Sequence, residues 1–152
     1  MKKDILYLIM TIIGAVLLLG TTVFVLMNWA QMPEQIPLHY NFAGEVTGYG
    51  GKAAIIPVLV IAWVIFVLMT VLVKFPKTWN IPVTVTKENF ERVYSITRAM
   101  MEVTKLEAVL LMMVTIISSA KGISLPWILM VILMVVILLT VLTGIYKLYK
   151  NK

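Results

Sequence analysis

The stretch 36–52, IPLHYNFAGEVTGYGGK, interrupts a chain that otherwise consists mainly of long apolar runs. It is polar and rich in glycine, and it carries the single histidine of the sequence, His39. The uncharged runs on either side, 5–29 and 53–73, are each long enough for a helix that crosses a hydrocarbon core of roughly 30 Å. The stretch therefore predicts a structured loop between two membrane-spanning helices.

The composition also indicates a membrane protein. Of the 152 residues 61% are hydrophobic and the mean hydropathy is +1.00, whereas a soluble domain is about half apolar. The absence of cysteine from the sequence excludes disulfides and thiolate metal sites. The net charge of +6 does not indicate nucleic-acid binding, because the basic residues flank the apolar runs and no recognition motif accompanies them. We therefore expect the lipid bilayer, and no nucleic acid, as a partner.

Two further segments complete the predicted fold. The segment 100–120 is long enough to span only if Glu102 and Lys105 extend back to the membrane interface, whereas 125–146 is uncharged throughout. We expect an all-α integral membrane protein that forms a single domain over residues 1–152. Its four transmembrane helices are predicted at about 5–29, 53–73, 100–120 and 125–146, with a loop at 30–52 and a polar segment at 74–99.

The distribution of basic residues predicts the orientation of these helices. With four spans, both termini lie on one side of the membrane, and that side holds all of the 13 lysines and arginines except Lys52 and Lys121. The positive-inside rule places such a side in the cytoplasm. We therefore expect a multi-pass protein of the cytoplasmic membrane with both termini inside and the loop 30–52 outside.

The polar segment is predicted to lead into a charged helix. Thr86 is a suitable N-cap residue, and Pro82 before it favours an extended backbone at 81–85. Opposite charges follow at spacings that place them on one helical stripe. These residues are Lys87, Glu91, Arg98, Glu102 and Lys105, with Glu107 almost opposite. The pattern is typical of a solvated cytoplasmic face.

The exterior loop contains an alternating pattern. Leu38, Tyr40 and Phe42 occupy alternate positions, and His39 and Asn41 lie between them. In an extended backbone the first three share one face and the two polar residues share the other. The glycines that follow permit turns and positive φ angles. The loop is therefore predicted to form a short β-hairpin that lays its aromatic face on the membrane or on helix ends.

The polar residues of the loop allow several interpretations. His39, Asn41 and Glu45 are the candidates for a polar site, but a metal site needs three or more well-placed donors. Catalysis with His39 as a general base and Glu45 as its orienting partner is conceivable, yet no nucleophile lies in a recognisable context. We therefore expect no catalytic residue, metal or cofactor. The side chains either fix the loop by bonding its own backbone or recognise an exterior partner.

Two motifs carry a resemblance to a known family. The loop motif runs Pro37-Leu38-His39-Tyr40-Asn41, then Gly44, Gly48-Tyr49-Gly50 and Lys52, and it resembles a bacterial membrane domain of uncharacterised function. A second stretch is similar to the segment after the second helix of such proteins. The candidate binding residues are Pro37, His39, Tyr40, Asn41, Gly44, Glu45, Gly48, Tyr49 and Lys52. The cytoplasmic motif comprises Asn80, Pro82, Thr86, Glu88, Asn89, Arg92 and Tyr94.

The resemblance implies a function at the plasma membrane of a bacterium. The same domain forms the first part of the immunity protein for the sporulation-delaying, or cannibalism, toxin, which protects the membrane against a secreted peptide toxin and sequesters a cytoplasmic repressor. That immunity protein carries additional helices beyond this domain, and the present chain departs from it there. No catalytic residues are implied.

We therefore expect a non-catalytic protein for immunity or stress sensing. Its exterior loop would bind a secreted peptide toxin or an envelope protein, and its cytoplasmic helix would contact a regulator or a transporter subunit. One alternative is a small membrane enzyme or transporter with a polar site beneath the loop. The scarcity of ionisable residues in the predicted spans beyond Glu107, expected at a cytoplasmic edge, argues against an ion path. A helper subunit of a membrane complex is the third possibility.

Overall fold

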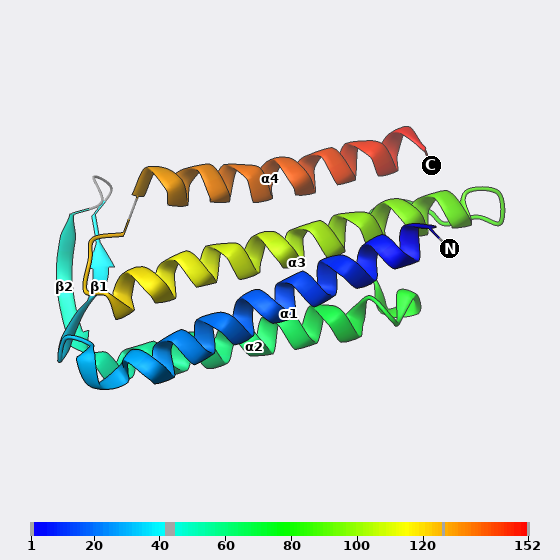
Figure 1. The fold of residues 1–152 in the computed structure, drawn as a ribbon. Helices are drawn as coiled ribbons and strands as arrows, with labels where there is room; N and C mark the ends of the chain where they lie inside the picture. Colours follow the sequence, from blue (N-terminus) through cyan, green and yellow to red (C-terminus); the bar gives the residue numbers. More distant parts are fainter. Residues whose placement is uncertain (1, 42–44, 126, 152) are drawn as a thin grey trace.

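A computed structural model describes residues 2–41, 45–125 and 127–151. Four long helices lie side by side, and a two-stranded hairpin crosses one end of the bundle (Figure 1). The elements in chain order are α1 (Lys2–Asn28), β1 (Gln35–Tyr40), β2 (Val46–Gly51), α2 (Ile55–Leu72), α3 (Phe90–Ala120) and α4 (Trp127–Lys150). Both ends of the chain lie at the end of the bundle opposite the hairpin (Figure 1).

Three of the four long helices are suited to cross a membrane. The qualifying segments are Asp4–Gln31, Lys52–Leu72 and Trp127–Lys150, which by length and composition match the spans predicted near 5–29, 53–73 and 125–146. Large apolar side chains such as Leu26, Val64 and Leu138 point outward from them and are more than half exposed. Exposure of so large an apolar surface to water is unfavourable, whereas contact of that surface with lipid is not.

The fourth helix, α3, lies at the centre of the bundle and packs against α1, α2 and α4. The sequence predicts that this helix begins near Thr86, whereas in the structure it begins at Phe90. Thr86 instead closes a turn just before the helix. Its Oγ1 accepts a hydrogen bond from the Asn89 amide at 3.3 Å, and its amide donates to Asn89 Oδ1 at 2.8 Å. This reciprocal pair resembles a capping box placed one turn early. The extended segment expected at 81–85 is irregular and forms no strand among the described residues.

The predicted solvated stripe on this helix is wrong in its second half. Glu102 and Lys105 are only 3% and 1% exposed, because the side of α3 that carries them faces α1 and α2. Lys105 is the middle residue of α3, about 22 Å from either end at 1.5 Å per residue. Neither side chain therefore extends to the membrane interface as the sequence analysis expects.

The apolar core runs from the middle of the bundle to the hairpin. Leu18, Phe66 and Ile116 join α1, α2 and α3, and Ile36 of β1 extends the same cluster. Gly14 lets α1 and α2 approach closely, since a Cβ there would lie 2.9 Å from the Phe66 ring. The three helices and the hairpin thus share one core.

The helix α4 is attached less extensively than the others. Gly144 and Leu148 are its buried residues among those described, and it packs mainly on α3. A Cβ at position 144 would lie 2.9 Å from Met100 Cγ and 3.2 Å from Met100 Cβ. Gly144 therefore permits a close approach of α3 and α4.

We predict different effects on stability for two glycine-to-alanine substitutions. Gly144→Ala forces Met100 aside and lowers the free energy of unfolding, despite the gain in helix propensity of about 1 kcal/mol. Gly20→Ala is the matched control, because nothing lies within 4 Å of its Cβ position, and it leaves stability unchanged or raises it. Thermal unfolding in detergent micelles measures both. Equal shifts in the two variants would contradict the close α3–α4 contact.

Candidate functional site

The loop between α1 and α2 forms the predicted hairpin. Strands β1 and β2 are antiparallel, with Gln35 opposite Gly51 and Tyr40 opposite Val46. The register shifts on both sides of His39, which pairs with Gly48. The hairpin is therefore locally irregular at the residue that the sequence singles out.

The glycines of the motif act differently from the prediction. Gly122, between α3 and α4, is the one described residue with a positive φ angle, whereas Gly48 and Gly50 lie in strand β2. A Cβ at Gly48 would lie 3.0 Å from His39 Cδ2, and one at Gly50 would lie 3.2 Å from Leu38 Cγ. These two glycines therefore leave room for the side chains of the facing strand. Gly44 lies outside the described residues.

One side of the hairpin rests on the helix ends. Ile36 and Pro37 are buried, and the Tyr40 hydroxyl is buried without a hydrogen-bond partner among the described residues. Burial raises the pKa of Tyr40, and the nearby Leu125 backbone and Ser119 side chain offset only part of this rise. The predicted aromatic face is thus found for Tyr40, whereas Leu38 is 38% exposed. Phe42 lies outside the described residues.

Two sets of polar contacts hold the hairpin in shape. At its tip, Asn41 Nδ2 donates to Glu45 Oε2 at 2.7 Å, and the Glu45 amide donates to Asn41 Oδ1 at 2.9 Å. At its base, Lys52 Nζ lies 2.8 Å from Glu34 Oε1 and 5.6 Å from the centre of the Trp29 ring. Asn41 therefore fixes the shape of the loop, as one of the interpretations expects. Glu45 and Lys52, which the sequence left as candidate binding residues, are also engaged within the hairpin.

Several side chains of the hairpin remain available to a partner. His39 is exposed and makes no hydrogen bond to any described residue, and Tyr49 is 63% exposed. His39 is not paired with Glu45, whose carboxylate bonds Asn41. Within the described ranges no three histidine, aspartate or glutamate side chains are grouped as a metal ion would require. The hairpin thus offers a contact surface of exposed aromatic, imidazole and aliphatic groups.

The second motif lies at the other end of the bundle (Figure 1). Its Tyr94 ring packs between Trp79 and Phe90, with ring centres 5.5 Å and 4.6 Å away. Asn89 is buried and donates to the Thr84 carbonyl at 3.0 Å. These residues fold the connection between α2 and α3, and the structure does not bring them together with the hairpin. The remaining residues of the motif are Asn80, Pro82, Glu88 and Arg92, all exposed, and a hydrogen bond with Thr86 lowers the pKa of Glu88.

A buried ion pair, which the sequence analysis missed, lies in the middle of the bundle. Lys105 Nζ is 2.6 Å from Glu102 Oε2 and donates to Thr11 Oγ1 at 2.8 Å. The same ammonium lies 5.6 Å from the centre of the Phe66 ring. Groups from α1, α2 and α3 therefore surround one lysine.

A second buried carboxylate lies close by on α3. Thr140 of α4 donates to Glu107 Oε1 at 2.7 Å, while Glu107 Oε2 is buried without a partner among the described residues. Glu107 follows the middle of α3 and is 9% exposed, so it lies inside the bundle, whereas the sequence predicts it at a cytoplasmic edge. It provides a polar link between α3 and α4.

The sequence contained a signal for these clusters. Glu102 and Lys105 are opposite charges three positions apart, and Thr11 and Thr140 are hydroxyl residues within apolar runs. Ionisable residues in membrane helices are usually paired inside the bundle. Applied to α3, that rule would have predicted that Glu102 and Lys105 pair inside the bundle rather than extend to the membrane interface.

Comparison with known proteins supports an uncharacterised membrane domain. Residues 16–73 match the model of a family described as "Domain of unknown function (DUF1648)", a match that covers the second half of α1, the hairpin and α2. The cytoplasmic motif lies outside the matched residues. No curated protein and no solved structure matches the chain. Toxin immunity therefore stays a prediction.

We predict that Lys105→Met lowers the free energy of unfolding by about 3–5 kcal/mol, because it leaves the Glu102 carboxylate buried and unpaired. The double variant Lys105→Met/Glu102→Met recovers most of this loss, since an apolar pair of similar volume replaces the charges. Chemical unfolding in micelles measures the effect, with Lys150→Met at an exposed position as control. A Lys105→Met loss no larger than that of the control would contradict the buried pair.

Proposed function

We propose that this chain is a bacterial plasma-membrane protein that binds a partner outside the cell through its hairpin. The main support for this proposal is the hairpin, which is held by polar contacts at its tip and base and leaves His39, Leu38 and Tyr49 exposed. Three apolar helices support the membrane setting. The hairpin and the termini lie at opposite ends of the bundle (Figure 1), and basic residues concentrate toward the termini. The positive-inside rule therefore favours an exterior hairpin.

The geometry of the hairpin suits recognition. The contacts at its tip and base hold the strands before any partner arrives, which reduces the ordering cost of binding. Aromatic side chains commonly supply the strongest contacts of an interface. An extended peptide or an envelope protein therefore fits this surface better than a small polar substrate. Immunity against a secreted peptide toxin, or stress sensing, is the corresponding biological role.

In this proposal α3 is the fourth crossing. It runs from the end that holds the termini to the hairpin end, alongside the other three helices (Figure 1). Its charged residues Glu102 and Lys105 are paired inside the bundle and turned away from lipid. The connection that contains Asn80, together with Arg92 in the first turn of α3, then lies in the cytoplasm, where it is available to a regulator or a transporter subunit.

A second candidate function is an ion or proton path through the bundle. It is favoured by the buried Lys105–Glu102 pair and by the buried Glu107 oxygen that has no hydrogen-bond partner within the described part of the chain, since ionisable residues within a membrane often mark such paths. This site lies in the middle of the helices rather than beneath the hairpin. The sequence argument against an ion path is correspondingly weaker.

Cysteine accessibility tests the orientation, because the chain has no native cysteine. We predict that a membrane-impermeant maleimide labels Thr47→Cys, at an exposed position of β2, in intact cells. Asn80→Cys, exposed at the opposite end, is expected to react only after permeabilisation. The reverse labelling pattern would place the hairpin inside and exclude an exterior partner.

Survival assays test the binding role. We predict that expression in a sensitive strain protects it against at least one of a panel of secreted peptides. Tyr49→Ala or His39→Ala should reduce that protection about tenfold, the effect of losing roughly 1.4 kcal/mol of binding energy. Tyr146→Ala is the matched control, because Tyr146 is 65% exposed on α4, away from the hairpin.

Unchanged survival across the panel, or full protection by both hairpin variants at normal protein levels, would count against the hairpin as a binding surface. Ion flux into protein-containing vesicles that stops on Glu107→Gln would favour the second candidate instead.

A further inference from the structure

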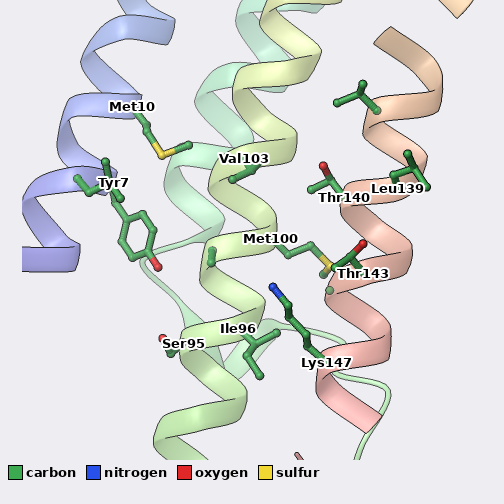
Figure 2. A pocket seen from close by; sticks show the side chains of 14 residues that line it. Tyr7, Met10, Ser95, Ile96, Met100, Val103, Leu139, Thr140, Thr143 and Lys147 are labelled. Carbon is green, nitrogen blue, oxygen red and sulfur yellow. The ribbon is translucent and has the colours of Figure 1, made fainter. Parts of the chain in front are cut away.

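An apolar groove lies between α1 and α4, with α3 as its floor (Figure 2). It has a volume of about 640 Å³. It forms because α4 packs mainly on α3 and leaves space beside α1. The residues of α4 that line it follow helical spacing from Val136 to Lys147, so one whole stripe of the helix faces the groove.

The groove changes in polarity along its length. Toward the middle of the bundle its walls are mainly apolar, with Met10, Val103 and Leu139 (Figure 2). Thr140 also lines this part, and its hydroxyl donates to Glu107. At the end near the termini it reaches Lys147, whose side chain points toward the groove in Figure 2 and forms no ion pair with a described residue. An amphiphile with an anionic head would match both ends.

The length of the groove matches one leaflet of a bilayer. From Val136 to Lys147 the helix rises about 16 Å, at 1.5 Å per residue. One leaflet contributes about 15 Å to a hydrocarbon core of roughly 30 Å. An acyl chain that enters from the leaflet at the end holding the termini would therefore reach the middle of the bundle.

A lipid suits this groove better than a second copy of the chain. An acyl chain is thin and can lie lengthwise in an apolar groove between two helices. A symmetric contact between two copies would bring their Lys147 side chains to the same end of the groove, where no acidic side chain lines it to pair with them. The charge of the groove therefore favours an anionic lipid.

Lys147 is a better anion contact than the cations of the neighbouring hollow. That hollow, of about 910 Å³, contains Lys74 and Arg98 but also Asp4 and Glu91, so its charges balance. Arg98 is already paired with Asp4 at 2.8 Å. Lys147 has no such acidic neighbour among the residues that line the groove.

We propose that the groove binds one anionic phospholipid of the surrounding bilayer. One acyl chain lies along α3 between α1 and α4, and the phosphate group lies at the Lys147 ammonium. This site is separate from the hairpin and does not depend on a partner outside the cell.

Lipid retention tests the proposal. The protein is reconstituted into vesicles of equal parts phosphatidylglycerol and phosphatidylcholine, extracted in mild detergent and analysed by native mass spectrometry. We expect one retained phosphatidylglycerol per chain. Lys147→Ala should reduce the preference for this lipid about fivefold, the contribution of one cation near an anionic headgroup. The matched control Lys150→Ala, at an exposed lysine that does not line the groove, should leave it unchanged.

A groove-filling variant tests the acyl-chain site. Ala99→Trp places an indole where the chain would lie and should abolish retention of both lipids. Val135→Trp, at an exposed position of α4 outside the groove, is the control and should retain lipid. Lys147→Ala changes an exposed side chain, so it tests the proposal even if Ala99→Trp fails to fold. Equal retention of the two lipids by the unaltered protein, unchanged retention in Lys147→Ala or in folded Ala99→Trp, or a lipid-free dimer would overturn the proposal.

Discussion

A charged side chain that is buried among apolar helices must find its partners within the protein, because its surroundings offer none. In this chain Lys105, which is 1% exposed at the middle of α3, has the Glu102 carboxylate and the Thr11 hydroxyl as partners. The pair belongs to α3, while Thr11 belongs to α1 and the Phe66 ring over the ammonium belongs to α2. Three helices therefore meet at this point, and α3, which carries the pair, packs against both α1 and α2.

The position of α3 divides the bundle into two unequal parts. The helices α1, α2 and α3 share an apolar core that continues through Ile36 into the hairpin. The helix α4 is attached to this unit mainly through α3, by the Gly144–Met100 contact and the hydrogen bond from Thr140 to Glu107. Because α4 does not close against α1, a groove remains on that side.

The hairpin extends the rigid part of the molecule into its surroundings. Its inner side chains join the core, its tip and base are held by polar contacts, and its exposed groups have no evident task in folding. This segment also lies within residues 16–73, which match a family described as a domain of unknown function. At the centre of the bundle the Lys105–Glu102 pair and Thr11 join α3 to α1, and the hydrogen bond from Thr140 to Glu107 joins α4 to α3.

The sequence by itself determined three membrane-suited helices and the hairpin between the first two. These features depend on local properties: the lengths of the apolar runs, and the alternation and glycines of the stretch 36–52. Only the tertiary structure decided three other features. These are the hydrogen bonds between Asn41 and Glu45, the contacts of Leu38 and His39 with glycines of the facing strand, and the burial of Lys105. A charge on a helix can face lipid, solvent or a neighbour, and the choice depends on which helix packs beside it. Residues 11 and 105 are far apart in the chain, so no local pattern could reveal that contact.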